Sequence, residues 1–142
     1  MISFLTENVK MPRVDRKALR AWITAVAAGY EGRRVGSLNY VFCNDDRMLE
    51  VNNEFLGHDY YTDIITFDYS QPGMISGDMY ISLDTVASNS FKFQTSYDKE
   101  LLRVIIHGVL HLCGINDKGP GQRAVMEAAE ERALDMWYKK QF

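Results

Sequence analysis

Apolar residues recur along this chain with two spacings, and the shorter spacing marks four candidate strands. Short runs rich in β-branched and aromatic residues are typical of strands, and here they cover residues 2–5, 37–43, 64–67 and 79–81. The last two runs flank the turn-forming segment Ser70-Gln71-Pro72-Gly73, so they are expected to form a hairpin or to lie side by side. The pattern predicts a sheet of roughly four strands.

Longer segments with apolar residues every three or four positions predict five helices. Pro12 suits the first turn of the first helix, and Asn44 or Asp45 can cap the second. Gly57 and Gly114 are expected to end the second and the fourth helix. The expected helices span residues 12–29, 46–55, 83–91, 97–112 and 122–138.

This order of elements predicts one α+β domain over residues 1–142, with a mixed sheet packed against helices. Hydrophobic residues make up 46% and charged residues 25%, values typical of a folded, water-soluble protein. No apolar run approaches the roughly 18 residues that a membrane span needs, and the first residues lack the order of a secretory signal. A cytoplasmic protein without a membrane partner is therefore expected. Its two cysteines, Cys43 and Cys113, are expected to be reduced thiols.

The clearest candidate chemistry is a metal site on the fourth helix, which Ser96 can cap. His107 and His111 are one helical turn apart, so both imidazoles can reach one ion. Gly114 lets the chain leave the helix, and Asp117 can then close the site as a third ligand. The spacing H-x3-H-x2-G-x2-D copies the ligand spacing of the metzincin pattern, with Asp in the last place. The sequence predicts a metzincin-like, metal-binding helix.

Gly108 bears on the class of reaction, because metalloproteases with this spacing carry a glutamate general base directly after the first histidine. Peptide hydrolysis by that mechanism is disfavoured. Cys113 lies on another side of the helix and is expected to be a small buried hydrophobe. His58 follows Gly57 in an expected loop, where it is either an ordinary surface residue or a residue at the edge of the site.

The charge is unevenly distributed along the chain. The whole chain carries a net charge of -3, whereas residues 1–40 hold seven basic and three acidic side chains. Four of the basic residues follow helical spacing on one side of the first expected helix: Arg13, Arg16, Lys17 and Arg20. This basic stripe is either a solvated face or a phosphate-contacting surface, for which Arg16 and Arg20 are the candidates.

Several segments together resemble one known family. Residues 107–117 read HGVLHLCGIND, residues 62–67 read TDIITF, residues 77–82 read GDMYIS, and Met126-Glu127 precede Glu130. These segments resemble the H-G-x-L-H-L-x-G-Y-D-H signature, the T-[DN]-V-L-S-F and G-D-I-x-I-[CS] segments, and the M-E-x-x-E helix of the YbeY family of endoribonucleases. The resemblance covers most of residues 40–131.

The resemblance implies one zinc ion per chain and single-strand-specific cleavage of RNA. It also implies a role in maturation of the small-subunit rRNA and in ribosome quality control, with the small ribosomal subunit or its rRNA as partner. Two residues depart from the family pattern: Asp117 replaces the third histidine, and Leu56 replaces an arginine thought to face the RNA.

Residues near the expected site have two open interpretations each. Thr62 and Asp63 precede a strand that borders the metal cleft in the resembling family, so they either orient substrate or cap a turn. Asp78 either supports a ligand or, as we favour, caps a turn. Glu127 and Glu130 are expected to pair with the arginines: Arg123 and Arg103.

The favoured function is a zinc-dependent endoribonuclease. Two rivals remain: a metallopeptidase or other hydrolase, which Gly108 weakens, and a non-catalytic ribosome-assembly factor with structural zinc, which the loss of arginine at Leu56 favours. A structural site would be closed by a fourth protein ligand, whereas a catalytic site keeps a position for water.

Overall fold

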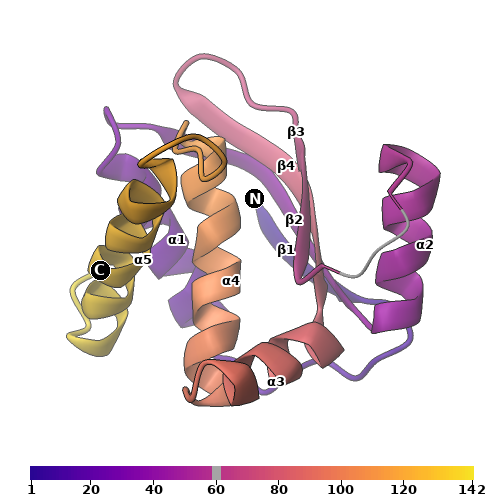
Figure 1. Ribbon diagram of the computed structural model, residues 1–142. Helices are drawn as coiled ribbons and strands as arrows, with labels where there is room; N and C mark the ends of the chain where they lie inside the picture. The colour runs from indigo at the N-terminus through magenta and orange to yellow at the C-terminus, as the bar shows by residue number, and fades with distance from the viewer. Residues whose placement is uncertain (59–61) are drawn as a thin grey trace.

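The computed structural model describes residues 1–58 and 62–142, and the strands in this part of the chain form one mixed sheet (Figure 1). The spatial order is β1-β2-β4-β3, in which β1 pairs with β2 and β2 with β4 in parallel, while β3 and β4 form an antiparallel hairpin. The strands are β1 (Ile2–Thr6), β2 (Arg34–Cys43), β3 (Ile64–Asp68) and β4 (Met74–Ser82). The predicted α+β class, the mixed sheet and the hairpin are confirmed.

The helices in the described residues cover both faces of this sheet. They are α1 (Arg16–Ala28), α2 (Asp45–Leu56), α3 (Leu83–Lys92), α4 (Tyr97–Leu112) and α5 (Gln122–Tyr138). Figure 1 shows α1, α4 and α5 on one face and α2 alone on the other, with α3 across one end.

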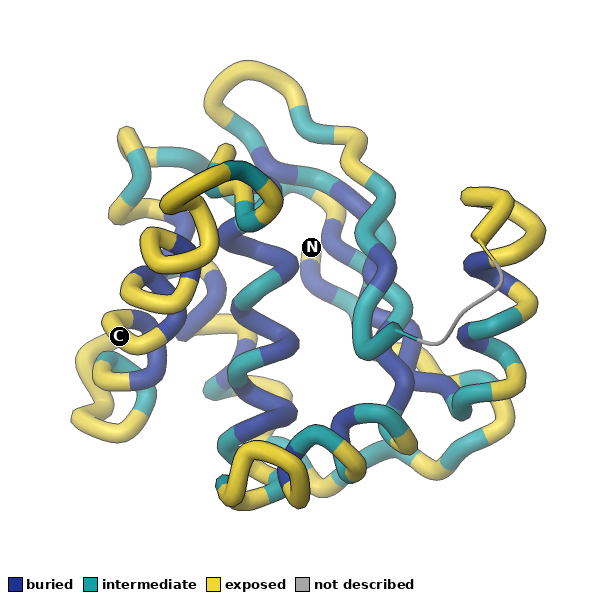
Figure 2. Tube along the Cα trace, in the orientation of Figure 1, coloured by how far each residue is buried: buried dark blue, intermediate teal, exposed yellow. Residues whose placement is uncertain are grey.

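Alternation along the strands explains the two faces. On β2, Leu38, Tyr40 and Phe42 are fully buried in the main core, which lies between the sheet and α1, α4 and α5. Cys43 and Ile65 belong to a smaller core under α2, together with Met48 and Val51. Figure 2 shows the buried residues along the sheet and on the inner faces of the helices.

The start of α1 was predicted wrongly. The helix begins at Arg16 rather than at Pro12, because the carboxylate of Asp15 accepts a hydrogen bond from the backbone N–H of Ala18 and caps the helix there. Arg13 consequently lies outside the helix, and the basic stripe is shorter than expected. The apolar stripe of α1 is buried as predicted: Leu19, Trp22, Ile23 and Val26.

Two strands are longer than predicted. β2 begins at Arg34 and β4 at Met74, because these two residues pair with each other and extend the parallel ladder beyond the apolar runs. The ends of α2 and α4 follow the local signals: Asn44 and Ser96 cap the helices, and Gly57 ends α2 with a left-handed backbone. Within residues 1–58 and 62–142, no helix combines the length and apolarity that crossing a bilayer requires.

Candidate metal centre and the cavity beside it

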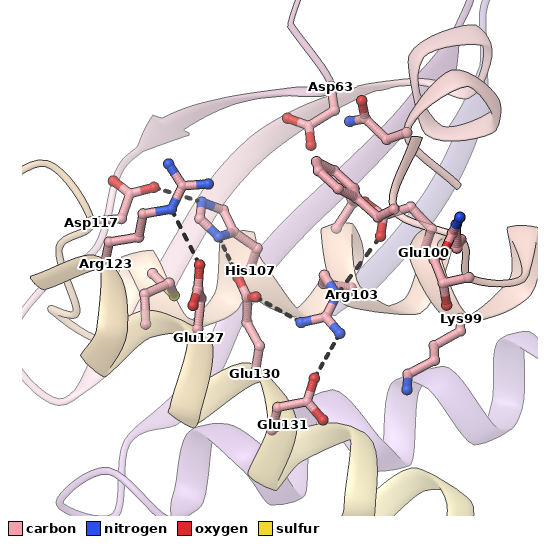
Figure 3. A pocket seen from close by; sticks show the side chains of 16 residues that line it. Asp63, Lys99, Glu100, Arg103, His107, Asp117, Arg123, Glu127, Glu130 and Glu131 are labelled. Carbon is pink, nitrogen blue, oxygen red and sulfur yellow. Dashed lines mark hydrogen bonds and ion pairs between the residues drawn. The ribbon is translucent and has the colours of Figure 1, made fainter. Parts of the chain in front are cut away.

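His107 on α4 lies between two carboxylates that come from different elements (Figure 3). Its Nδ1 is 2.7 Å from Oε2 of Glu130 on α5, and its Nε2 is 3.5 Å from Oδ2 of Asp117, which follows α4. Because a carboxylate only accepts hydrogen bonds, the Glu130 contact holds the proton on Nδ1 of a neutral ring. The lone pair of Nε2 then faces Asp117.

Glu130 is itself held by Arg103, which stands one turn before His107 on α4. The Arg103 guanidinium contacts Oε1 of Glu130 at 3.1 Å and a carboxylate oxygen of Glu131 at 2.7 Å, and it lies 3.7 Å from Glu100. The side chains of Glu100 and Glu130 are almost fully buried, so the guanidinium offsets charges that would otherwise be costly. Arg103 therefore fixes the carboxylate that orients His107.

These charges also set the protonation of the site. Burial alone would lower the pKa of His107, but the hydrogen bond to Glu130 and the negative charges of Glu130, Asp117 and Asp63 raise it above the ordinary value. Burial raises the pKa of Asp63, although the nearby charge of His107 opposes that shift. Both groups bind a proton more readily than they would in water.

The donor atoms at His107 suit zinc. In a tetrahedral site with ligands at 2.0 to 2.1 Å, neighbouring donors lie roughly 3.3 Å apart, close to the 3.5 Å between His107 Nε2 and Asp117 Oδ2. A carboxylate on the far nitrogen, as Glu130 provides, is the usual partner of a zinc-binding histidine. His111 follows one turn later on the same side of α4.

The predicted group of three ligands is only partly assembled. The structure brings His107 and Asp117 together, but among residues 1–58 and 62–142 no three His, Cys, Asp or Glu side chains are placed to hold one ion. His111 is half-buried, and its role as a ligand stays a prediction.

Gly108 faces the sheet rather than the candidate centre. A Cβ at this position would lie 2.4 Å from Sδ of Met79 and 3.1 Å from Cδ1 of Ile64. A side chain here would have to displace Met79 and Ile64, so the packing disfavours a glutamate general base at this position.

An open cavity of about 750 Å³ lies beside His107. It runs along α4. Its other walls come from α5, from the end of α3 and the segment that follows it, and from Asp63 and Asp117. Its charged lining residues are Asp63, Lys99, Glu100, Arg103, Asp117, Arg123, Glu127, Glu130 and Glu131. Figure 3 shows Asp117 and Lys99 at opposite ends, with Arg103 between them.

The other residues singled out in the sequence lie in different places. Asp63 lines the cavity, and the hydroxyl of Thr62 donates a hydrogen bond to the carbonyl of Ile64 at 3.5 Å. Arg20 donates to the carbonyl of Ile2 and lies over the ring of Phe4.

Two further candidates lie in the described residues without lining the cavity. Arg16 is exposed at the start of α1, and His58 is exposed directly after Gly57, the residue that ends α2. Their functional roles stay predictions.

The roles expected for the acidic residues were confirmed for Glu127 and Glu130 but not for Asp78. Glu127 pairs with Arg123 at 3.2 Å and Glu130 with Arg103, as predicted. Asp78 neither supports a ligand nor caps a turn, because it lies within β4 and accepts a hydrogen bond from Asn39 on β2. Cys43 and Cys113 are buried free thiols, as expected.

Sequence reasoning missed the contact between Glu130 and His107 and the central place of Arg103. The spacing of Glu100, Arg103 and His107 on one side of α4 was a readable signal, since residues three and four apart on a helix are neighbours. The missed contacts join residues far apart in sequence, with 23 positions between His107 and Glu130 and 28 between Arg103 and Glu131, and no local pattern indicates them.

Comparisons with known proteins identify the family of this chain. The model of the family described as Endoribonuclease YbeY matches residues 2–138. This chain belongs to the YbeY endoribonuclease family. A YbeY protein of Phocaeicola vulgatus is 63% identical over 134 residues, covering 94% of this chain and 96% of the relative, and one of Porphyromonas gingivalis is 51% identical over 135 residues, covering 95% and 89%.

A solved structure supports the same fold. The solution structure of TM1509 from Thermotoga maritima covers 99% of this chain and 93% of its own, with 26% identity and a TM-score of 0.65. The family name describes enzymes that cut RNA internally, and membership groups this chain with RNA-cleaving hydrolases.

Proposed function

We propose that this chain is a zinc-dependent endoribonuclease that cuts single-stranded RNA. The observation that carries the proposal is the position of His107, whose Nε2 faces Asp117 at 3.5 Å while Glu130 holds its Nδ1. In a chain of the YbeY family, this is the arrangement in which a histidine is ready to bind a metal ion.

His107, His111 and Asp117 would hold the zinc ion. When bound, zinc supplies a Lewis acid for a phosphate oxygen and lowers the pKa of a bound water. The rest of the chemistry belongs to the chain. Glu130 and Arg103 keep the His107 ring in one orientation, and Asp63, a half-buried carboxyl with a raised pKa that lines the cavity, is our candidate for accepting or returning a proton.

The RNA substrate that we propose is rRNA of the small ribosomal subunit, processed in the cytoplasm during ribosome maturation and quality control. Support comes from family membership and from the resemblance of residues 107–117 to the family signature. The cavity beside His107 is open to solvent along α4, so a flexible strand can enter it.

One rival function has a specific observation in its favour. Leu56, which stands where the family has arginine, is 44% exposed at the end of α2, so this position presents no cation to a phosphate group. A non-catalytic assembly factor with structural zinc would tolerate that loss. The peptidase alternative is weakened, because a glutamate at position 108 would have to displace Met79 and Ile64.

The test uses the same RNA sequence as a single strand and as a duplex. The zinc-loaded protein is expected to cut only the single strand, to stop when a chelator is added, and to recover when zinc is restored. Thermal unfolding is followed in parallel, since a catalytic ion should change the melting temperature modestly, whereas a structural ion should hold the fold together. Absence of cleavage, combined with unfolding by the chelator, would favour the assembly factor.

A further inference from the structure

The cavity has two chemically different ends. Around His107 it is acidic, with Asp63, Asp117, Glu127 and Glu130 in its walls. The other end is lined by uncharged polar side chains, one aromatic ring, one cation and one carboxylate: Asn89, Phe93, Gln94, Thr95, Lys99 and Glu100. Lys99 and His107 are eight residues apart on α4, which separates the two ends by about 12 Å along the helix axis.

Phe93 is the unusual residue at this second end. It is the residue at which α3 stops, and it is 55% exposed although it lines the cavity. The ammonium of Lys92 lies 5.5 Å from the centroid of its ring. A solvent-accessible ring with a neighbouring cation is what proteins use to stack an unpaired base and to hold the phosphate next to it.

Gln94, which follows Phe93 and lines the same cavity, has a strained backbone conformation. Its φ of 54° lies in the left-handed region, where glycine is the unstrained residue. The N–H of Thr95 donates to the carbonyl of Ser90 and closes the helix end, which fixes that geometry. With Asn89, two residues with side-chain amides line the same cavity as the ring, and each amide offers both donors and an acceptor to the edge of a base.

We propose that Phe93, Asn89 and Gln94 form a subsite that holds one unpaired nucleobase of the RNA, while the centre at His107 acts on a phosphodiester bond nearby. This inference rests on the proposed function, and it supplies a physical reason for a preference for single strands. A base in a duplex is already stacked on its neighbours and paired along its edge, so it cannot enter the subsite.

RNA fits this end of the cavity better than a protein partner does. The ring of Phe93 shares its cavity with His107, and Lys92 and Lys99 provide the cations that a polyanion requires. Phe91 makes the matched comparison, because it is 90% exposed only two residues away, yet it is not part of the cavity wall in the described structure.

The experiment measures kcat and KM of the zinc-loaded full chain on a short single-stranded RNA with one mapped cleavage site. A series of the same RNA lacks the base at one nucleotide at a time. The variants are Phe93→Ala, Phe93→Trp, which keeps a stacking surface, and Phe91→Ala as the control. Stacking losses by alanine substitution correspond to about a fivefold or greater loss of affinity.

The proposal predicts that Phe93→Ala raises KM about fivefold or more, that Phe93→Trp restores it, and that Phe91→Ala leaves it unchanged. In the parent, removal of one particular base should raise KM similarly, and that same removal should have no further effect in Phe93→Ala. The subsite alone would be overturned if Phe93→Ala kept the KM of the parent. It would also be overturned if Phe91→Ala raised KM as much as Phe93→Ala does, because the two rings would then act as one general apolar docking patch. A parent that cuts none of these RNAs would overturn the proposed function and the subsite with it.

Discussion

Replacing Glu130 with glutamine tests how His107 is oriented. The change keeps the shape of the side chain. It removes the negative charge of the carboxylate that accepts the hydrogen bond from Nδ1 of His107 at 2.7 Å. Only 8% of the Glu130 side chain is exposed, so solvent screens this contact weakly. Loss of such a partner of a metal-binding histidine typically lowers metal affinity about 10- to 100-fold, or roughly 1.4 to 2.8 kcal/mol.

The assay is zinc affinity, measured by competition with a chromophoric chelator. Glu127→Gln is the matched control, because Glu127 lies on the same helix, carries the same charge and pairs with Arg123 at the surface, where 60% of its side chain is exposed. Its affinity for zinc should stay close to that of the parent. In the zinc-free protein, the pKa of His107 read by NMR should fall in Glu130→Gln, since Glu130 is a principal cause of its rise.

Two results would refute this reasoning. Zinc affinity equal to that of the parent in Glu130→Gln would show that the carboxylate does not orient a metal ligand. An equal loss in both glutamine variants would show that only the general negative charge of α5 matters.

Three stability predictions follow from the packing. Burial raises the pKa of Glu100, so its charged form opposes folding, and the stability that the protonated form provides at low pH is lost as pH rises through the folded pKa. Glu100→Gln should therefore melt at the same temperature as the parent in acid and at a higher temperature at neutral pH. Equal melting temperatures at neutral pH would contradict this prediction. Gly108→Ala should destabilise by about 1 to 3 kcal/mol in urea, since the added methyl meets buried Met79. Trp22→Phe should cost about 1 to 2 kcal/mol by the same measurement, because it removes the buried 2.8 Å bond to the carbonyl of Ala133.

Local signals in the sequence were enough to predict most elements. Ser96 and Gly114 bracket the helix that carries His107, and both behave as their chemistry dictates. The start of α1 had two competing local signals, and the carboxylate cap of Asp15 prevailed over Pro12. The extra length of β4 comes from pairing with β2. This pairing depends on residues 39 or more positions away, so the sequence around β4 alone does not predict it.

The candidate centre was predictable only as far as α4 reaches. The spacing of His107 and His111 is a property of one helix, so it can be read from the sequence. The contact between His107 and Glu130 depends on how α5 packs against α4, and the sequence gives no register for that packing. The pair between Glu130 and Arg103 was expected, but the contact of Arg103 with Glu131 was not, because it too depends on the packing of α5 against α4.

Zinc content and RNA cleavage, measured on the same preparations of the parent and His107→Ala, test the central claim most directly. The parent should hold about one zinc ion per chain and cut single-stranded RNA, because His107 anchors the centre. His107→Ala should remain folded, lose most of its zinc and lose cleavage. A folded His107→Ala protein that keeps its zinc and cuts RNA at the parental rate would contradict the account.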